Sequence, residues 1–279
     1  MRKFLRWISA LAPVRVVSRW LGISSFMRKV YHRWAAPDSI FRAQVSGIPI
    51  MLYARTGRDL IWFEGAVVTD REWSEKRALE AMLAFLNPGD VAYDVGANLG
   101  LYSVTLAKRV GERGQVISFE PRRSTFETLT ANIELNDLKN VRCFQKALGE
   151  QAAKLPIYTF PEEPWCSSLM EGQEKVLGGT PGVEYVEVEV GDPFRKANHL
   201  PVPRAIKIDV EGFEYAVMRG LGETLGDPRC QFVGCEMHPH LLPPGITPQH
   251  VMDLLRSYGF KRIDLSPCGL DQKIDCYKA

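Results

Sequence analysis

From residue 91 onward, short apolar runs alternate with longer segments in which apolar residues recur every three or four positions. The runs predict β-strands and the longer segments predict amphipathic helices. Strands are expected at 91–95, 115–120, 141–147, 204–210, 230–237, 261–266 and 273–278, and helices at 99–110, 122–136, 213–224 and 248–258. This alternation is typical of an α/β fold in which helices cover both faces of a mostly parallel sheet. The last two strands share only a short connector, which predicts an antiparallel pair.

Two segments depart from this alternation. Residues 38–90 form a lead-in, with strands predicted over 44–68, turns at Gly47 and Gly57, and then a helix that ends at the sequence NPGD. Residues 152–200 interrupt the core with two strand-like patterns around a loop rich in Gly and Glu. The chain is therefore expected to comprise an arm at 1–37, the lead-in at 38–90 and a core at 91–279 that carries the insertion at 152–200.

The arm at residues 1–37 is basic. It holds eight of the 35 Lys and Arg residues and no acid, which leaves 27 Lys and Arg against 33 Asp and Glu in the rest of the chain. Its pattern predicts short amphipathic helices with Trp on their apolar faces. Such faces suit the surface of an anionic membrane, and they suit the protein body or a second subunit equally well. Peripheral membrane contact and homo-oligomerisation both stay open.

Composition and cysteine spacing limit the class of protein to which the chain can belong. The hydrophobic content of 46% and charged content of 24% are those of an ordinary globular protein. The six cysteines form no C-x-x-C pair and match no zinc pattern, and several lie in apolar runs, which indicates a reducing compartment. No apolar run approaches the length of a membrane-spanning helix. We therefore expect a cytoplasmic protein, with attachment to the inner face of the membrane left open.

The sequence VAYDVGANLG at 91–100 ends the first core strand with an acid and a glycine loop. In open α/β sheets, ligands bind beyond the carboxyl ends of the strands. A phosphate-binding loop would need a Lys-Ser/Thr pair after the last glycine, and a dinucleotide site would need a glycine where Asn98 stands. The loop therefore favours a ligand without pyrophosphate, and Asp94 suits a cationic one.

S-adenosylmethionine (SAM) meets these requirements, because it carries an ammonium and a sulfonium and no phosphate. Gly96 would let the backbone approach its methionine part, and Asp94 would attract the positive centre. Glu120 follows the second core strand and would accept hydrogen bonds from the ribose hydroxyls, as an acid does in dinucleotide folds. The alternative is a tight turn beside a solvated acid.

Acids and a histidine follow the fourth and fifth core strands. Asp209 and Glu211 end the sequence IKIDVE, while Glu236 and His238 end VGCEMH. Groups of this kind that converge on one crevice are candidates for acid–base chemistry. Glu214 is interpreted only as a favourable residue at the start of a helix.

Neutral His238 is the predicted general base, because imidazole titrates near neutral pH, and Asp209 would orient the attacking hydroxyl or share its proton. The alternative is that Asp209, Glu236 and His238 bind Mg²⁺. Because Mg²⁺ prefers oxygen ligands, the histidine disfavours that site, and no metal is expected.

Three blocks of the sequence resemble the FkbM family of SAM-dependent methyltransferases: DVGANLGLYSVTLAK, FEPRRSTFETLTANIELND and IKIDVEGFEYAVMRGL. The resemblance covers about residues 62–240. It implies a Rossmann-like class I methyltransferase fold, with a seven-stranded sheet whose last strand is antiparallel, and O-methylation of a sugar, glycan or polyketide-like hydroxyl. By position, it assigns to the SAM site Asp94, Gly96, Asn98, Gly100, Glu120, Ala147 and Leu148, and to the substrate side Asp209, Glu211 and Glu236.

The acceptor and the location stay undetermined, because GDPF at 191–194 departs from the family pattern and the basic arm lies outside the shared domain. We expect a small-molecule or glycan acceptor and no nucleic-acid partner. Two other functions stay open: a non-catalytic SAM-binding scaffold at a membrane surface, and a nicotinamide-dependent oxidoreductase, which Asn98 disfavours.

Overall fold

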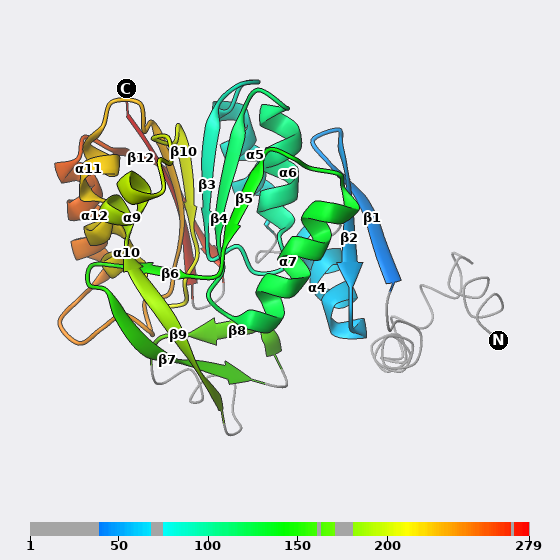
Figure 1. The fold of residues 1–279 in the computed structure, drawn as a ribbon. Helices are drawn as coiled ribbons and strands as arrows, with labels where there is room; N and C mark the ends of the chain where they lie inside the picture. Colours follow the sequence, from blue (N-terminus) through cyan, green and yellow to red (C-terminus); the bar gives the residue numbers. More distant parts are fainter. Residues whose placement is uncertain (1–38, 68–74, 161–162, 171–180, 269–270, 279) are drawn as a thin grey trace, which may run out of the picture.

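A seven-stranded sheet forms the centre of the molecule in the computed structural model, which describes residues 39–67, 75–160, 163–170, 181–268 and 271–278 (Figure 1). The predicted arm at 1–37 lies outside these residues. The strand order is β12-β13-β11-β10-β3-β4-β5. The strands are β3 (Val91–Val95), β4 (Gln115–Phe119), β5 (Val141–Phe144), β10 (Ala205–Ile208), β11 (Phe232–Met237), β12 (Lys261–Cys268) and β13 (Asp271–Tyr277).

The strand directions confirm the predicted fold class. Strands β3, β4, β5, β10 and β11 are mutually parallel, and β13 is antiparallel to both of its neighbours. From β3 the chain builds the sheet outward through β4 and β5, and it then returns to place β10 on the other side of β3. This reversal is the switch point at which open α/β sheets bind their ligands.

Helices cover both faces of the sheet, as predicted. One face packs against α5 (Lys76–Phe85), α6 (Leu101–Val110) and α7 (Arg123–Leu135), and the other against α10 (Glu214–Gly220) and α12 (Pro248–Ser257). The short helices α9 (Gly191–Ala197) and α11 (Gly222–Gly226) lie beside α10. Strand residues alternate between the two faces: Ala92 joins the first core and Tyr93 the second. The apolar runs are therefore continuous because both faces of the strands are buried.

The lead-in has the predicted turn at Gly47, but its first strand begins at Ser39 rather than at residue 44, and the chain beyond Gly57 differs. Strands β1 (Ser39–Val45) and β2 (Ile48–Ala54) form a hairpin whose turn has positive φ at Ser46 and Gly47. The predicted strand beyond Gly57 is wrong, because Gly57–Val67 is helix α4. Thr56 and Asp59 exchange side-chain to backbone hydrogen bonds at its start, and this reciprocal cap outweighs the β propensity of the bulky residues that follow.

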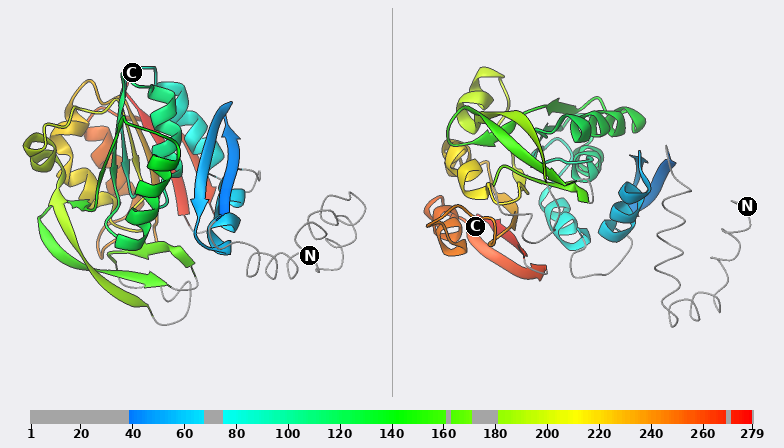
Figure 2. Two further views of the ribbon diagram at one scale, coloured as in Figure 1. Left: turned by 45° about the vertical axis from the view of Figure 1, so that its right-hand side comes forward. Right: turned by 90° about the horizontal axis from the view of Figure 1, so that it is seen from below.

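The hairpin packs against α7 through β2 (Figure 2). Two asparagines hold it there, Asn132 on α7 and Asn136 directly after the last residue of this helix. The Asn132 amide accepts the Tyr53 N–H at 2.5 Å and donates to the Leu99 carbonyl at 2.7 Å. One turn later, Asn136 accepts the Met51 N–H at 3.2 Å and donates to the carbonyl of the same residue at 2.6 Å. Strand β2 pairs with β1 along one edge, and side chains rather than a second strand satisfy backbone groups of Met51 and Tyr53.

Replacement of Asn132 by alanine is expected to lower the free energy of unfolding by about 2–4 kcal/mol, because two buried backbone groups lose their partners. Urea denaturation measures the effect, and Glu134→Ala, on the exposed side of the same helix, is the matched control. A loss no larger than that of the control would show that water replaces both bonds.

A second sheet is built largely from the insertion and lies across the carboxyl ends of the main strands (Figure 1). Its order is β6-β9-β7-β8, in which β6 and β9 are parallel and the other pairs antiparallel. The strands are β6 (Ala147–Gly149), β7 (Ala153–Phe160), β8 (Glu163–Ser168) and β9 (Gly182–Val190). Among the described residues, none of the helices has both the length and the apolar character needed to span a membrane.

Candidate active site

A cleft opens between the carboxyl ends of the main strands and the second sheet. The loop after β3, the residue after β4, strand β6 and the turn after β10 all contribute to its wall. The predicted site residues that line it are Gly96, Asn98, Glu120, Ala147, Leu148, Asp209 and Glu211. The remaining predicted residues, Asp94, Gly100, Glu236 and His238, are not part of this lining.

The glycine loop owes its shape to contacts within the protein. Gly96 has φ +80°, and a Cβ atom there would lie 1.8 Å from the backbone oxygen of Asp209, so the turn after β10 leaves no room for a side chain. The N–H groups of Gly96 and Ala97 both donate to the Phe119 carbonyl, at 3.0 and 2.9 Å. A Cβ at Gly100 would meet a methyl carbon of Leu129 on α7 at 2.8 Å. The glycines therefore serve strand and helix packing as well as any ligand.

Asp94 lies beneath the loop rather than on the surface of the cleft. Its carboxylate is fully buried and accepts the Ser103 hydroxyl at 2.6 Å. The ammonium of Lys207 is 3.6 Å from its other oxygen. Burial raises the pKa of Asp94, and Lys207 opposes that rise. The predicted direct attraction of Asp94 for a bound cation is therefore corrected: its buried partner is Lys207.

Lys207 is a member of the site that the sequence interpretation missed. It is 7% exposed, donates to the Gly96 carbonyl at 2.7 Å and lies 3.2 Å from Asp209. Its ammonium also lies over the ring of Tyr102, 5.2 Å from the centroid. A lysine inside an otherwise apolar parallel strand is the signal that could have identified it. Through these contacts, Lys207 links the loop after β3 to the turn after β10.

Glu120 connects the loop to helix α7. One carboxylate oxygen accepts the Asn98 N–H at 2.8 Å, and the other accepts the Arg122 N–H at 3.0 Å and the Thr125 hydroxyl at 2.7 Å. Burial raises the pKa of Glu120, and these bonds oppose that rise. A carboxylate has about four acceptor positions, so one remains on the oxygen that meets Asn98.

The chemistry of the cleft fits SAM. Glu120 offers an acceptor for a ribose hydroxyl, Ala147 and Leu148 offer apolar surface for adenine, and the carboxylates of Asp209 and Glu211 suit a cationic ligand. Among the described lining residues, the basic side chain is Lys146, which is ion-paired with glutamates of β9. A phosphate group would therefore have to compete with these glutamates for the ammonium of Lys146.

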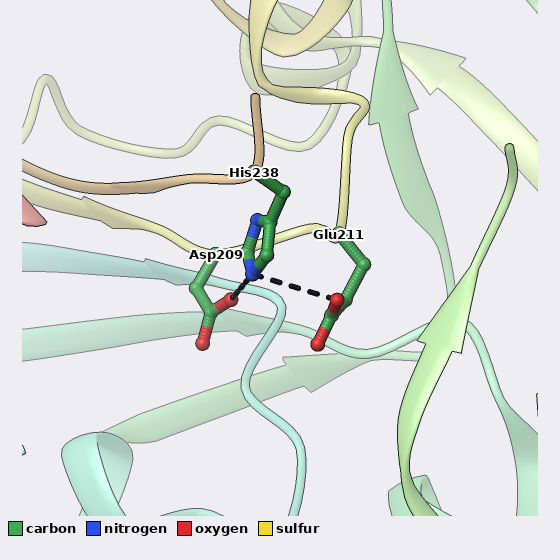
Figure 3. Close-up of side chains that lie close together, drawn as sticks. All are labelled: Asp209, Glu211 and His238. Carbon is green, nitrogen blue, oxygen red and sulfur yellow. Dashed lines mark ion pairs between the residues drawn. The ribbon is translucent and has the colours of Figure 1, made fainter. Parts of the chain in front are cut away.

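His238 follows β11 and has acids near both of its ring nitrogens, of which Figure 3 shows Asp209 and Glu211 beside Nε2. Its Nδ1 is 2.6 Å from Oε1 of Glu214, which is fully buried and also accepts the Gly212 N–H at 2.9 Å. Its Nε2 is 3.4 Å from Glu211 and 3.9 Å from Asp209. Glu214, interpreted from the sequence as a helix-start residue, is therefore the partner that orients this histidine.

The electrostatic setting changes the predicted role of His238. Burial lowers its pKa, but Glu211, Glu214 and Asp209 together raise that pKa well above the usual value for histidine. This raised pKa favours the protonated ring in the unliganded protein and disfavours a neutral general base, so that role of His238 stays a prediction. Burial raises the pKa of Asp209, whereas Lys207 and His238 lower it, with a net decrease that keeps this carboxylate ionised.

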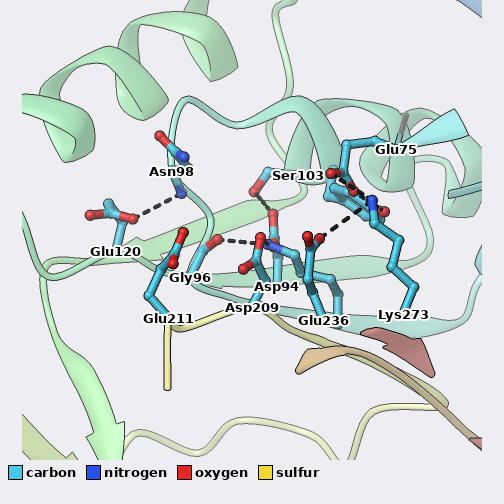
Figure 4. A network of polar contacts seen from close by, with 12 residues as sticks. Glu75, Asp94, Gly96, Asn98, Ser103, Glu120, Asp209, Glu211, Glu236 and Lys273 are labelled. Atoms are coloured by element: carbon cyan, nitrogen blue, oxygen red, sulfur yellow. Dashed lines mark hydrogen bonds and ion pairs between the residues drawn. The ribbon is translucent and has the colours of Figure 1, made fainter. Parts of the chain in front are cut away.

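Glu236 occupies an adjoining hollow instead of the cleft (Figure 4). Its carboxylate is 3.4 Å from Lys273, and burial together with nearby carboxylates raises its pKa to about 8. The residue that joins Asp209 and His238 in one group is Glu211. The alternative cation site that included Glu236 is therefore corrected.

Comparison with known proteins also indicates a methyltransferase. Residues 94–262, more than half of the chain, match the methyltransferase FkbM domain. The chain is 28% identical over 148 residues to Methyltransferase 1 of Beauveria bassiana, covering 48% of this chain and 59% of that protein. It is 28% identical over 173 residues to the hexuronic acid methyltransferase AglP of Haloferax volcanii, covering 62% of this chain and 66% of the relative.

A solved structure of methyltransferase FkbM from Methylobacillus flagellatus aligns with a TM-score of 0.47 at 14% identity, over 79% of this chain and 59% of that one. The chain thus spans 59% and 66% of the length of the two relatives named above. On the extent of the domain match, this chain belongs to the FkbM family of SAM-dependent methyltransferases.

Proposed function

We propose that this protein transfers a methyl group from SAM to a hydroxyl of a sugar, glycan or polyketide-like acceptor. One observation carries the proposal: Gly96, Asn98 and Glu120 line the same cleft as Asp209 and Glu211. A cofactor held by the first group would thus lie beside acids that can act on an acceptor. The name of the Haloferax relative, a hexuronic acid methyltransferase, supports a sugar as the first acceptor to test.

The residues of this chain would bind both partners and manage one proton. Bound SAM supplies a methyl group on a sulfonium, so that transfer forms a C–O bond, breaks a C–S bond and leaves a thioether. Because His238 already holds a proton, we assign the hydroxyl proton to the carboxylate of Glu211. Asp209, held by Lys207, would orient the hydroxyl.

The test is a methyl-transfer assay with labelled SAM and a panel of uronic acids, neutral sugars, glycans and polyketide-like alcohols. We expect transfer to at least one hydroxyl acceptor, confirmed by mass spectrometry of the product. Glu211→Gln should lower turnover by about 100-fold or more and leave SAM affinity unchanged. Glu134→Gln, on the exposed side of α7, is the control and should match the wild type.

Two outcomes would contradict the proposal. SAM binding in calorimetry with no transfer to any acceptor would support the non-catalytic scaffold. Binding of NAD(H) in place of SAM would support the oxidoreductase.

A further inference from the structure

Asp209, Glu211 and His238 present three metal-ligating atoms to one point beside the cleft (Figure 3). One such atom from each residue lies within 4.8 Å of the others. His238 Nε2 is 3.4 Å from Glu211 Oε2 and 3.9 Å from Asp209 Oδ1. Atoms bound to one cation at about 2.0–2.2 Å lie roughly 3–4 Å apart, so small side-chain rotations would complete the site.

His238 provides a second observation that does not depend on the acids being clustered. Its side chain is 3% exposed, and its Nδ1 is occupied by Glu214. Its Nε2 faces the two carboxylates, 3.4 Å from Glu211 and 3.9 Å from Asp209, and both distances are longer than a normal N–H···O hydrogen bond. A metal-bound histidine almost always donates its other ring N–H to a carboxylate or carbonyl, which is the contact that Glu214 makes here.

The two carboxylates are arranged so that a cation would face the substrate. Asp209 and Glu211 both line the cleft, while the buried ring of His238 stands behind them. Lys207 holds Oδ2 of Asp209 at 3.2 Å, which leaves Oδ1 on the side of His238. Three protein ligands on one side leave the remaining coordination positions open toward the cleft.

We propose that Asp209, Glu211 and His238 bind a divalent transition-metal cation that coordinates the acceptor oxygen. One imidazole with two carboxylates suits Mn²⁺, Fe²⁺ or Zn²⁺ better than Mg²⁺, which favours oxygen ligands and keeps several waters. The inference rests on the proposed function and deepens it: the cation would displace the proton that Nε2 holds in the metal-free protein, because a histidine ligand must be deprotonated. A bound cation makes the acceptor hydroxyl more acidic, and the proton then passes to the Glu211 oxygen that does not bind the metal.

The first experiment uses Mn²⁺ alone as the probe. The full chain, treated with EDTA and then desalted, is titrated with Mn²⁺, and free Mn²⁺ is followed by electron paramagnetic resonance. We expect one saturable site per chain. Glu211→Gln and His238→Ala should each weaken it at least tenfold, while Glu134→Gln should leave it unchanged. Far-UV circular dichroism and SAM calorimetry on each variant show that the fold is intact.

The second experiment separates this inference from the proposed function. Methyl transfer should fall on EDTA treatment and return with Mn²⁺, and more weakly with Mg²⁺. Full transfer after EDTA treatment without a Mn²⁺ site would overturn the cation and leave the methyltransferase standing. A saturable Mn²⁺ site that both Glu211→Gln and His238→Ala weaken, without transfer to any acceptor, would uphold the cation and overturn the proposed reaction. Equal Mn²⁺ binding by wild type, Glu211→Gln and His238→Ala would overturn the site.

Discussion

Replacement of Lys207 by methionine is expected to lower the free energy of unfolding by about 3–5 kcal/mol, the usual cost when one partner of a buried ion pair is removed. The Lys207 ammonium is 3.6 Å from the fully buried Asp94 and 3.2 Å from Asp209. It also donates to the Gly96 carbonyl at 2.7 Å. Methionine fills a similar volume, but it leaves two carboxylates and a carbonyl without their cationic partner.

Urea denaturation measures this loss, and the double variant Lys207→Met/Asp94→Asn tests its cause. Removing the Asp94 charge as well should restore part of the stability, because the uncompensated buried charge is the main penalty. Lys139→Met is the matched control, since the ion pair of Lys139 with Asp137 is exposed. If Lys207→Met were no less stable than this control, the buried pair would contribute nothing.

The stability deficit of Lys207→Met should shrink as the pH falls from 8 toward 5. Burial raises the pKa of Asp94, and Lys207 is the strongest influence that lowers it, so the variant raises this pKa further. A carboxyl whose pKa is higher in the folded than in the unfolded state binds its proton more tightly when folded. Stability therefore rises as pH falls through the folded pKa. A deficit that grew at low pH would contradict this account.

Much of the fold could be predicted because it depends on local pattern. Strands such as β3 and β10 are buried on both faces, so they read as apolar runs that end where a polar residue reaches the cleft. The arrangement of those ends follows from parallel strands, which is why Glu120 and Asp209 could be placed at one edge. Helix α4 was missed because its bulky residues favour a strand, and the cap at Thr56 went unnoticed.

The parts of the site that could not be predicted depend on contacts between distant residues. Glu214 and His238 are 24 positions apart, and no periodicity reveals that their side chains meet. Glu236 and His238 are two residues apart, so they would lie on the same face of a continuous strand. Strand β11 ends at Met237, however, and the alternation of faces stops there. The clash that demands glycine at position 96 comes from the Asp209 backbone, which directly follows another strand, β10.

Replacement of Glu214 by alanine is expected to lower methyl-transfer turnover by about 10–100-fold without a comparable change in SAM affinity. Glu214 does not line the cleft; it acts through His238, whose Nδ1 it holds at 2.6 Å. Without this carboxylate the ring can rotate, and its Nε2 no longer points between Asp209 and Glu211. The loss should appear in kcat rather than in the KM for SAM, because the cofactor loop is untouched.

The conservative variant Glu214→Gln separates a positioning role from a purely structural one. It keeps the shape and one acceptor oxygen, so a positioning role predicts that turnover recovers toward the wild-type value. The Mn²⁺ affinity should stay reduced, because the charge behind the histidine is gone. Glu223→Gln, an exposed acid on α11, is the control and should change neither quantity. If Glu214→Ala lowered stability, SAM affinity and turnover in equal measure, Glu214 would be a core residue. If instead turnover and Mn²⁺ affinity fell together while SAM affinity held, Glu214 would be the residue that positions the histidine for its partner in the cleft.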